Sequence, residues 1–186
     1  TQEGLFRHFE AIAAATSTPI VLYNVPPRTG CDLAAATVGR LARIEGVVGI
    51  KDACGDATRV TQILTAVKDQ GVENFFILSG EDAQTMQMME LGAVGTISVT
   101  ANVLPAKMAA FCSAFLSGDT VRAVSQDEHL QPGHDILFVE SSPTPTKWAL
   151  ADMGRIPAGI RLPLIPLSAE HREAVRQRVQ AAGNSL

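Results

Sequence analysis

The sequence of 186 residues carries a formal net charge of −4 and is 46% hydrophobic, but only 5% of its residues are aromatic. This composition supports one domain, or one domain with an appendage, around a core of small aliphatic side chains. The absence of lysine and arginine runs argues against nucleic acid and anionic membranes as partners, and no apolar stretch is long enough to span a membrane.

Helical and strand-like patterns alternate along the first hundred residues. The helical patterns lie at residues 4–16, 33–44, 58–71 and 83–92. The strand patterns lie at residues 19–25, 47–53, 74–82 and 93–102. Such alternation is typical of a parallel sheet covered by helices, so we expect an α/β fold.

The ends of the expected strands recur at regular distances. Tyr23 and Lys51 are 28 residues apart, Lys51 and Ser79 are again 28 apart, and Ile97 follows Ser79 by 18. Units of this size without a glycine-rich nucleotide turn favour a (β/α) barrel, which has eight units and about 250 residues when complete. The four units counted here, and a start at Thr1 without methionine, lead us to expect the C-terminal half of a (β/α)8 TIM barrel over residues 1–103.

No strand pattern stands out after Leu104, so residues 104–186 are predicted to form a helical C-terminal region. Proline-rich joints, including "SSPTPT", separate its helical patterns. These patterns lie at residues 105–117, 119–139, 146–153 and 168–182.

Cysteine and histidine usage points to a cytoplasmic protein without a metal site. The three cysteines are odd in number and widely spaced, which fits free thiols in a reducing cytosol better than a disulfide framework. None of the four histidines has a carboxylate or cysteine companion at ligand spacing.

Lys51 is the first candidate for chemistry, because barrel enzymes carry their sites at the C-terminal ends of the strands. It directly follows the apolar run Val47–Ile50, so its stem must start inside the barrel. Apolar surroundings favour the neutral form of an amine, and a neutral amine is what Schiff-base chemistry with a carbonyl requires. The alternative is a structural lysine that reaches solvent or pairs with Asp52 or Asp56.

Tyr23 and Arg28 are the second and third candidates. Tyr23 stands at the matching end of the preceding strand, where its hydroxyl could relay protons for Lys51. Arg28 follows two prolines and offers a fork of donors suited to a carboxylate or phosphate. Each also has a plain structural interpretation, as a strand aromatic and as a solvated loop charge.

The motifs "YNVPPRTGCDL" and "VVGIKDA" together resemble the dihydrodipicolinate synthase (4-hydroxy-tetrahydrodipicolinate synthase) family of class I pyruvate-dependent aldolases. The stretches "LSGEDA", "GTISVTANV" and "FVESSPTPTKWAL" extend this resemblance over residues 1–168. It implies that the first half of the family's barrel would precede Thr1. That half would carry the rest of the proton relay and the lysine feedback site.

The resemblance also implies site residues and partners. Lys51 would form an imine with pyruvate, Tyr23 would relay protons, and Arg28 would bind a carboxylate of the second substrate, aspartate semialdehyde. The main chain at Ile97 would contact pyruvate, and Gly80 would lie near the second substrate. The family works in lysine and diaminopimelate biosynthesis, uses no metal or organic cofactor, and forms homo-oligomers, as dimers or tetramers.

Other functions stay open at this point. The arginine in "PPRTG" favours the synthase over N-acetylneuraminate lyase or another 2-keto acid aldolase of the superfamily, whose second substrate can be a sugar aldehyde. A phosphate site at "SGED" is disfavoured by the adjacent acidic residues. A non-catalytic half-barrel that binds or regulates is the alternative of another class. We expect the isolated chain to have little synthase activity.

Overall fold

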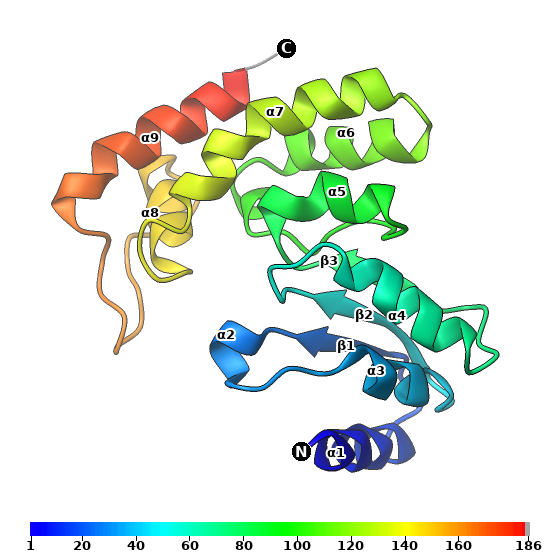
Figure 1. Ribbon diagram of the computed structural model, residues 1–186. Helices are drawn as coiled ribbons and strands as arrows, with labels where there is room; N and C mark the ends of the chain where they lie inside the picture. The colour runs from blue at the N-terminus through cyan, green and yellow to red at the C-terminus, as the bar shows by residue number, and fades with distance from the viewer. Residues whose placement is uncertain (185–186) are drawn as a thin grey trace. The chain divides into compact units, whose positions relative to one another are not determined.

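The computed structural model describes residues 1–184, which form two compact units that divide between Ile97 and Ser98 (Figure 1). The first unit is an α/β structure built on a three-stranded parallel sheet in the order β1-β2-β3. The first three predicted strands are therefore confirmed. They are β1 (Ile20–Asn24), β2 (Val47–Asp52) and β3 (Phe76–Ser79).

The helices of the first unit follow the predicted alternation. The first begins and ends two residues earlier than its sequence pattern, and the later ones are shorter than their patterns. Helix α2 occupies "PPRT", which the sequence indicates only as a stiffened loop, because proline at the first helical position and a left-handed glycine after the last one favour a single turn. The helices are α1 (Gln2–Ala14), α2 (Pro26–Thr29), α3 (Ala35–Ala42), α4 (Arg59–Lys68), the 3-10 helix η1 (Asp82–Gln84) and α5 (Thr85–Glu90).

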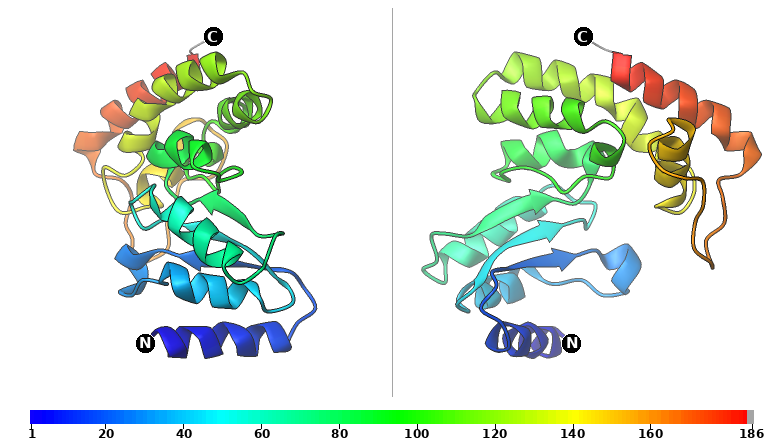
Figure 2. Two further views of the ribbon diagram at one scale, coloured as in Figure 1. Left: turned by 45° about the vertical axis from the view of Figure 1, so that its right-hand side comes forward. Right: turned by 180° about the vertical axis from the view of Figure 1, so that it is seen from behind.

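Strand alternation gives the sheet two different faces. Figures 1 and 2 show from opposite sides that α3 and α4 cover one face of the sheet. Leu22, Ile50 and Ile77 are fully buried and, by strand alternation, lie on the face opposite to Tyr23 and Lys51. The other face holds Tyr23 and Lys51, and it is only partly buried. The covered face supplies the apolar core of this unit, and the open face carries the predicted chemistry.

A register shift at the start of the sheet determines which residues of β1 and β2 face each other. Ile20 pairs with Val47, but the next residue, Val21, pairs with Gly49. Val48 is therefore the extra residue of a bulge. Beyond this point the pairing is regular and brings Tyr23 opposite Lys51.

The prediction of a fourth strand at residues 93–102 is wrong. This segment runs beside β3 through backbone hydrogen bonds that link Val94 to Ile77 and Gly95 to Ser79, yet it forms only an isolated parallel bridge between Ser79 and Thr96. Gly95 has φ of +156°, a conformation that favours glycine and departs from regular extended backbone. The chain then turns into the 3-10 helix η2 (Thr100–Asn102), so the first unit has three strands and not four.

The second unit begins at Ser98 and is helical. Its core joins the ends of several helices through buried aliphatic side chains, including Val103, Leu137, Leu167 and Val175. Arg176 ties two of the helices together, because its Nε and Nη2 atoms lie 2.9 and 2.7 Å from the carboxylate oxygens of Asp152. The helices are α6 (Pro105–Leu116), α7 (Thr120–Ile136), α8 (Thr144–Asp152) and α9 (Ala169–Asn184).

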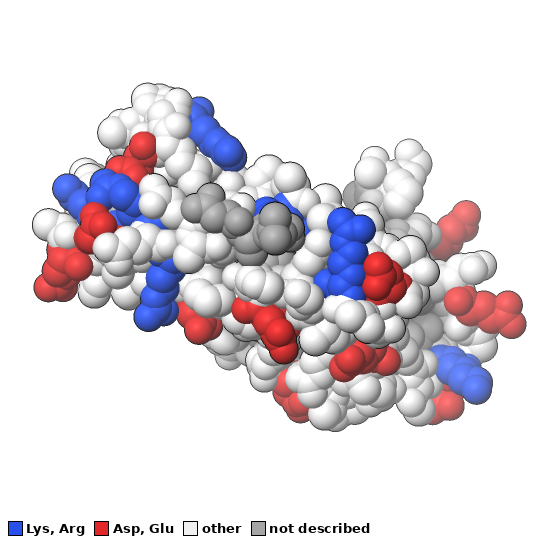
Figure 3. All heavy atoms as spheres, turned by 90° about the horizontal axis from the view of Figure 1, so that it is seen from above, with Lys and Arg blue, Asp and Glu red and all other residues white. Residues whose placement is uncertain are grey.

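The surface charge is mixed in sign. On the face seen in Figure 3, lysine and arginine side chains alternate with aspartate and glutamate and leave no large area of one sign. Among residues 1–184, no helix combines the length and apolar character that a membrane crossing requires.

Candidate active site

Tyr23 and Lys51 are in contact at the C-terminal ends of neighbouring strands. They are register partners across β1 and β2, and the Lys51 Nζ atom lies 4.1 Å from the centroid of the Tyr23 ring. An amine at this distance from an aromatic face gains a favourable interaction when it is charged. Tyr23 is 45% exposed and Lys51 is half-buried, so both side chains are reachable from the open face of the sheet.

Gly80 lies against the aliphatic stem of Lys51. Its N–H donates to the carbonyl of Asp52 at 2.7 Å, which brings the turn after β3 next to the end of β2. A Cβ atom added at Gly80 would stand 2.9 Å from the Cε atom of Lys51 and 2.8 Å from the Cβ atom of Ala53. Only glycine fits here while the lysine keeps its position.

Arg28 and Ile97 lie near the strand ends without joining the Tyr23–Lys51 contact. Arg28 is exposed on α2, and its guanidinium forms no hydrogen bond or ion pair within residues 1–184. Ile97 is 49% exposed, and its N–H donates to the carbonyl of Ser79 at 2.9 Å. A main-chain contact from Ile97 to a ligand would therefore have to use its carbonyl oxygen.

Glu81 brings an acid close to Lys51. Partial burial and the neighbouring charge of Asp82 raise the pKa of Glu81, while the positive charge of Lys51 opposes this shift. The Ser79 hydroxyl donates to the Glu81 carbonyl at 2.8 Å and accepts from the Glu81 N–H at 3.1 Å, so the turn is fixed at this point. From the sequence alone, this acidic residue argues only against a phosphate site.

A buried polar cluster lies one residue beyond Tyr23 and Lys51, on the opposite face of the sheet. Asn24 follows Tyr23 and Asp52 follows Lys51, and the Asn24 amide donates to an Asp52 carboxylate oxygen at 3.2 Å. The Arg59 Nε atom, at the start of α4, lies 3.8 Å from the other oxygen of Asp52. The suggested pairing of Lys51 with Asp52 is therefore wrong, because strand alternation directs the two side chains to opposite faces.

This cluster is the part of the site that sequence reasoning missed. Alternation along the two strands could have placed Asn24 and Asp52 together on the helix-covered face, since both follow a residue assigned to the open face. It could not have indicated Arg59, which comes from a separate helix.

Burial dominates the ionisation of Asp52. The side chain is 1% exposed, and the loss of water raises its pKa, although the charge of Arg59 and the hydrogen bonds from Asn24 and Cys54 act in the opposite direction. The folded state therefore holds this proton more tightly than the unfolded state does. Ionisation of Asp52 thus costs stability, and the cost appears as pH rises from the ordinary pKa of 3.8 through the raised value.

We predict that Asp52→Asn reduces the stability loss between about pH 4 and pH 7 relative to the wild type. Asparagine keeps an acceptor for the Asn24 amide and the Cys54 N–H but has no charge to desolvate. Urea unfolding of both proteins across this pH range measures the effect as a difference between two stability curves. Parallel curves would contradict the raised pKa.

The described residues hold no group of three histidine, cysteine, aspartate or glutamate side chains arranged to bind a metal ion.

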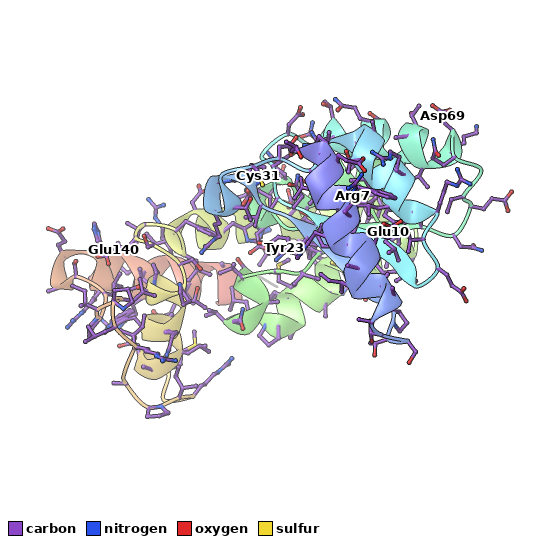
Figure 4. The ribbon with its side chains drawn as sticks, turned by 90° about the horizontal axis from the view of Figure 1, so that it is seen from below. Arg7, Glu10, Tyr23, Cys31, Asp69 and Glu140 are labelled. Carbon is purple, nitrogen blue, oxygen red and sulfur yellow. The ribbon has the colours of Figure 1, made fainter. Side chains whose placement is uncertain are left out.

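Tyr23 precedes α2 in the sequence and Cys31 follows it, and both are labelled in Figure 4. Cys31 and Cys54 are free thiols.

Comparison with known proteins gives consistent matches over nearly the whole chain. The chain is 49% identical over 183 residues to the 4-hydroxy-tetrahydrodipicolinate synthase of Methylococcus capsulatus and 45% identical to that of Pseudomonas aeruginosa. Each alignment covers 98% of this chain, but only 62% and 61% of the relative. The chain thus spans about three-fifths of the length of these curated relatives.

Solved structures match at the level of the backbone as well. The pyruvate complex of chloride-inhibited dihydrodipicolinate synthase from Acinetobacter baumannii is 45% identical, with a TM-score of 0.92 over 98% of this chain and 62% of that one. Dihydrodipicolinate synthase from Thermotoga maritima is 37% identical, with a TM-score of 0.94 over the same shares. The dihydrodipicolinate synthetase family pattern matches residues 1–182, and the chain belongs to this family.

Proposed function

We propose that this chain carries the Schiff-base half of a 4-hydroxy-tetrahydrodipicolinate synthase, which condenses pyruvate with aspartate semialdehyde. The observation that carries the proposal is the contact between Lys51 and Tyr23 at paired strand ends, 4.1 Å from amine to ring centroid. Family membership over residues 1–182 and the similarity to 4-hydroxy-tetrahydrodipicolinate synthases support the same reaction.

In the proposed reaction, the Lys51 amine adds to the keto carbon of pyruvate, and loss of water gives an imine. Loss of a proton from the methyl group then gives an enamine, because the iminium accepts the electron pair. The enamine carbon forms a bond to the aldehyde carbon of the second substrate. Attack by that substrate's amino group on the imine carbon closes the ring and returns the lysine amine.

Tyr23 is proposed to relay protons during imine formation and ring closure. Its hydroxyl can both donate and accept a proton, and its ring already contacts the lysine amine. Gly80 supports the geometry by leaving room for the lysine stem, and the Ile97 carbonyl is proposed to contact pyruvate.

Arg28 is proposed to bind the carboxylate of aspartate semialdehyde. It is exposed and without a protein partner in the described residues, so its donors are available to a ligand. This residue favours the synthase over the alternative, an N-acetylneuraminate lyase or related aldolase that takes a sugar aldehyde.

We infer further that the three-stranded sheet is part of a (β/α)8 barrel and that the active protein is a homo-oligomer. The match to dihydrodipicolinate synthases over about three-fifths of their length supports the barrel. Tyr23 lies on an open sheet face, so we expect residues 1–186 alone to show little synthase activity. A non-catalytic half-barrel that binds or regulates would also show little synthase activity. Pyruvate trapping on Lys51 distinguishes this alternative from the proposed synthase.

The test is borohydride reduction in the presence of pyruvate, followed by peptide mass spectrometry. It is applied to residues 1–186 and to a joined protein, in which this chain follows the N-terminal part of the Methylococcus capsulatus relative that it does not match. We expect a pyruvyl adduct on Lys51 in the joined protein. Absence of the adduct from a folded joined protein would reject the proposal.

The second substrate is identified by comparing two aldehydes in the joined protein. Aspartate semialdehyde should be consumed with pyruvate, while N-acetylmannosamine should not. The reverse preference would assign the protein to the lyase side of the superfamily.

We predict that Gly80→Ala slows pyruvate trapping on Lys51 by roughly 10-fold to 100-fold, because the added Cβ displaces the lysine stem. Overpacking should also lower the unfolding free energy by about 1–3 kcal/mol. The rate of adduct formation and a urea titration measure the two effects. Gly4→Ala, on the exposed helix α1, is the matched control and should leave trapping unchanged.

A further inference from the structure

The segment that carries Arg28 is closed into a loop by a single side chain. At its start stands Asn24, the last residue of β1, and at its end stand Asp32 and Leu33. The Asn24 amide nitrogen donates to the Asp32 carboxylate at 2.8 Å, and the Asn24 oxygen accepts from the Leu33 N–H at 3.0 Å. Both ends of the loop are therefore held at the end of β1.

Arg59, the first residue of α4, binds the same end of the loop. Its Nη2 atom lies 3.0 Å from the Asp32 carboxylate and also donates to the Leu33 carbonyl. Its Nε atom lies 3.8 Å from Asp52, at the end of β2. The side chain is 14% exposed, so this guanidinium is largely removed from water and competes little with it for these contacts.

The cluster holds two carboxylates around one cation. Asp52 accepts from Asn24 at 3.2 Å and from the Cys54 N–H at 3.0 Å, which ties it to the backbone beyond β2. Without Arg59, Asp32 and Asp52 would face each other across the Asn24 amide with no compensating positive charge. The loop end would then be held only by Asn24 and by Gln2, whose Nε2 atom donates to the Asp32 carbonyl at 2.7 Å, and the repulsion between the two carboxylates would weaken this closure.

The support of Arg28 differs from that of Tyr23 and Lys51. Tyr23 and Lys51 are held by backbone pairing within the sheet. Arg28 stands on the single turn of α2, whose own bonds are local: Thr29 Oγ1 donates to Val25 and Cys31, and the Gly30 N–H donates to Pro26. The position of α2 relative to the strand ends therefore depends on the loop closure.

We propose that Arg59 is a positioning residue that fixes the Arg28 segment against the ends of β1 and β2. The consequence for catalysis rests on the function proposed above. Loss of Arg59 should weaken recognition of a carboxylate on the aldehyde substrate and leave imine formation at Lys51 largely intact, because the sheet holds Lys51 independently.

Hydrogen exchange tests the positioning itself, without reference to activity. In residues 1–186, Arg59→Gln should speed amide exchange in segment 25–33 at least tenfold, after correction for any change in global stability. Arg40→Gln removes a matched arginine of the same unit, which forms an exposed ion pair with Glu3, and should leave this segment unchanged. Equal exchange in the wild type and Arg59→Gln would overturn the proposal.

Kinetics of the joined protein test the consequence. Arg59→Gln should raise KM for aspartate semialdehyde at least tenfold, with less than a threefold change in pyruvate trapping on Lys51. Arg59→Lys keeps the charge and should show a smaller rise in KM than Arg59→Gln. This variant also tests the proposal if Arg59→Gln folds poorly. A proportional fall of trapping and synthase activity in both variants would show a purely structural residue and overturn the proposal.

The two proposals fail in different ways. If the wild-type joined protein forms no pyruvate adduct, the proposed function fails while the exchange experiment still decides the positioning by Arg59. If the adduct forms and segment 25–33 exchanges equally in all variants, the proposed function stands and the positioning by Arg59 is rejected.

Discussion

Lys51→Arg in the joined protein should abolish the pyruvate adduct and lower the synthase rate by about 10³-fold or more. Arginine keeps a positive charge beside the Tyr23 ring, but a guanidinium has no free amine that can form an imine. The change therefore removes the covalent chemistry and retains most of the electrostatics. Mass spectrometry after borohydride reduction and a coupled rate assay measure the two effects.

Lys68→Arg is the matched control for this prediction. Lys68 is exposed at the end of α4, away from the strand ends, and its replacement should change neither the adduct nor the rate. A pyruvyl adduct that persists at wild-type level in Lys51→Arg would show that another amine carries the reaction.

Arg28→Ala should raise KM for aspartate semialdehyde by roughly 10-fold to 100-fold, because a charge-assisted hydrogen bond contributes about 1.5–3 kcal/mol. Pyruvate trapping on Lys51 should stay at the wild-type rate, since strand pairing holds Lys51 in the sheet and Arg28 stands on a separate element, α2. Steady-state kinetics with the aldehyde varied at saturating pyruvate give the KM values.

Arg43→Ala controls for the loss of an arginine charge from this unit. Arg43 is exposed just after α3 and should be replaceable without a change in either parameter. An unchanged KM in Arg28→Ala would remove the main reason to prefer a carboxylated aldehyde over a sugar aldehyde.

The strand ends could be predicted from the sequence because each follows a short apolar run. The equal spacing of Tyr23, Lys51 and Ser79 matches the register only in part. Tyr23 faces Lys51, but Lys51 faces Leu78, and Ser79 is shifted by one residue to face Asp52. The fourth strand was mispredicted because the apolar pattern at residues 93–102 says nothing of the backbone angle at Gly95. Pairing continues past Gly95 only as one bridge, between Ser79 and Thr96, and β3 itself ends at Ser79.

The Arg59 cluster shows a different limit of sequence reasoning. Arg59 and Asp32 are 27 positions apart on different elements, and neither stands in a motif that marks a functional pair. Their meeting follows from the packing of α4 against α3 and the sheet, which is a tertiary event. The meeting of Asn24 and Asp52 could have been predicted, because the alternation of side chains along each strand places both on the same face.

The bulge at Val48 has a consequence for how this family can vary. If Val48 paired regularly with Val21, the register at Ile20 would continue unchanged and Tyr23 would face Ile50 instead of Lys51. The alignment of the amine with the phenol is therefore set at the far end of the strands from the chemistry. Loss of the bulge by regular pairing of Val48 would therefore separate the two groups, although it removes no group that touches a substrate.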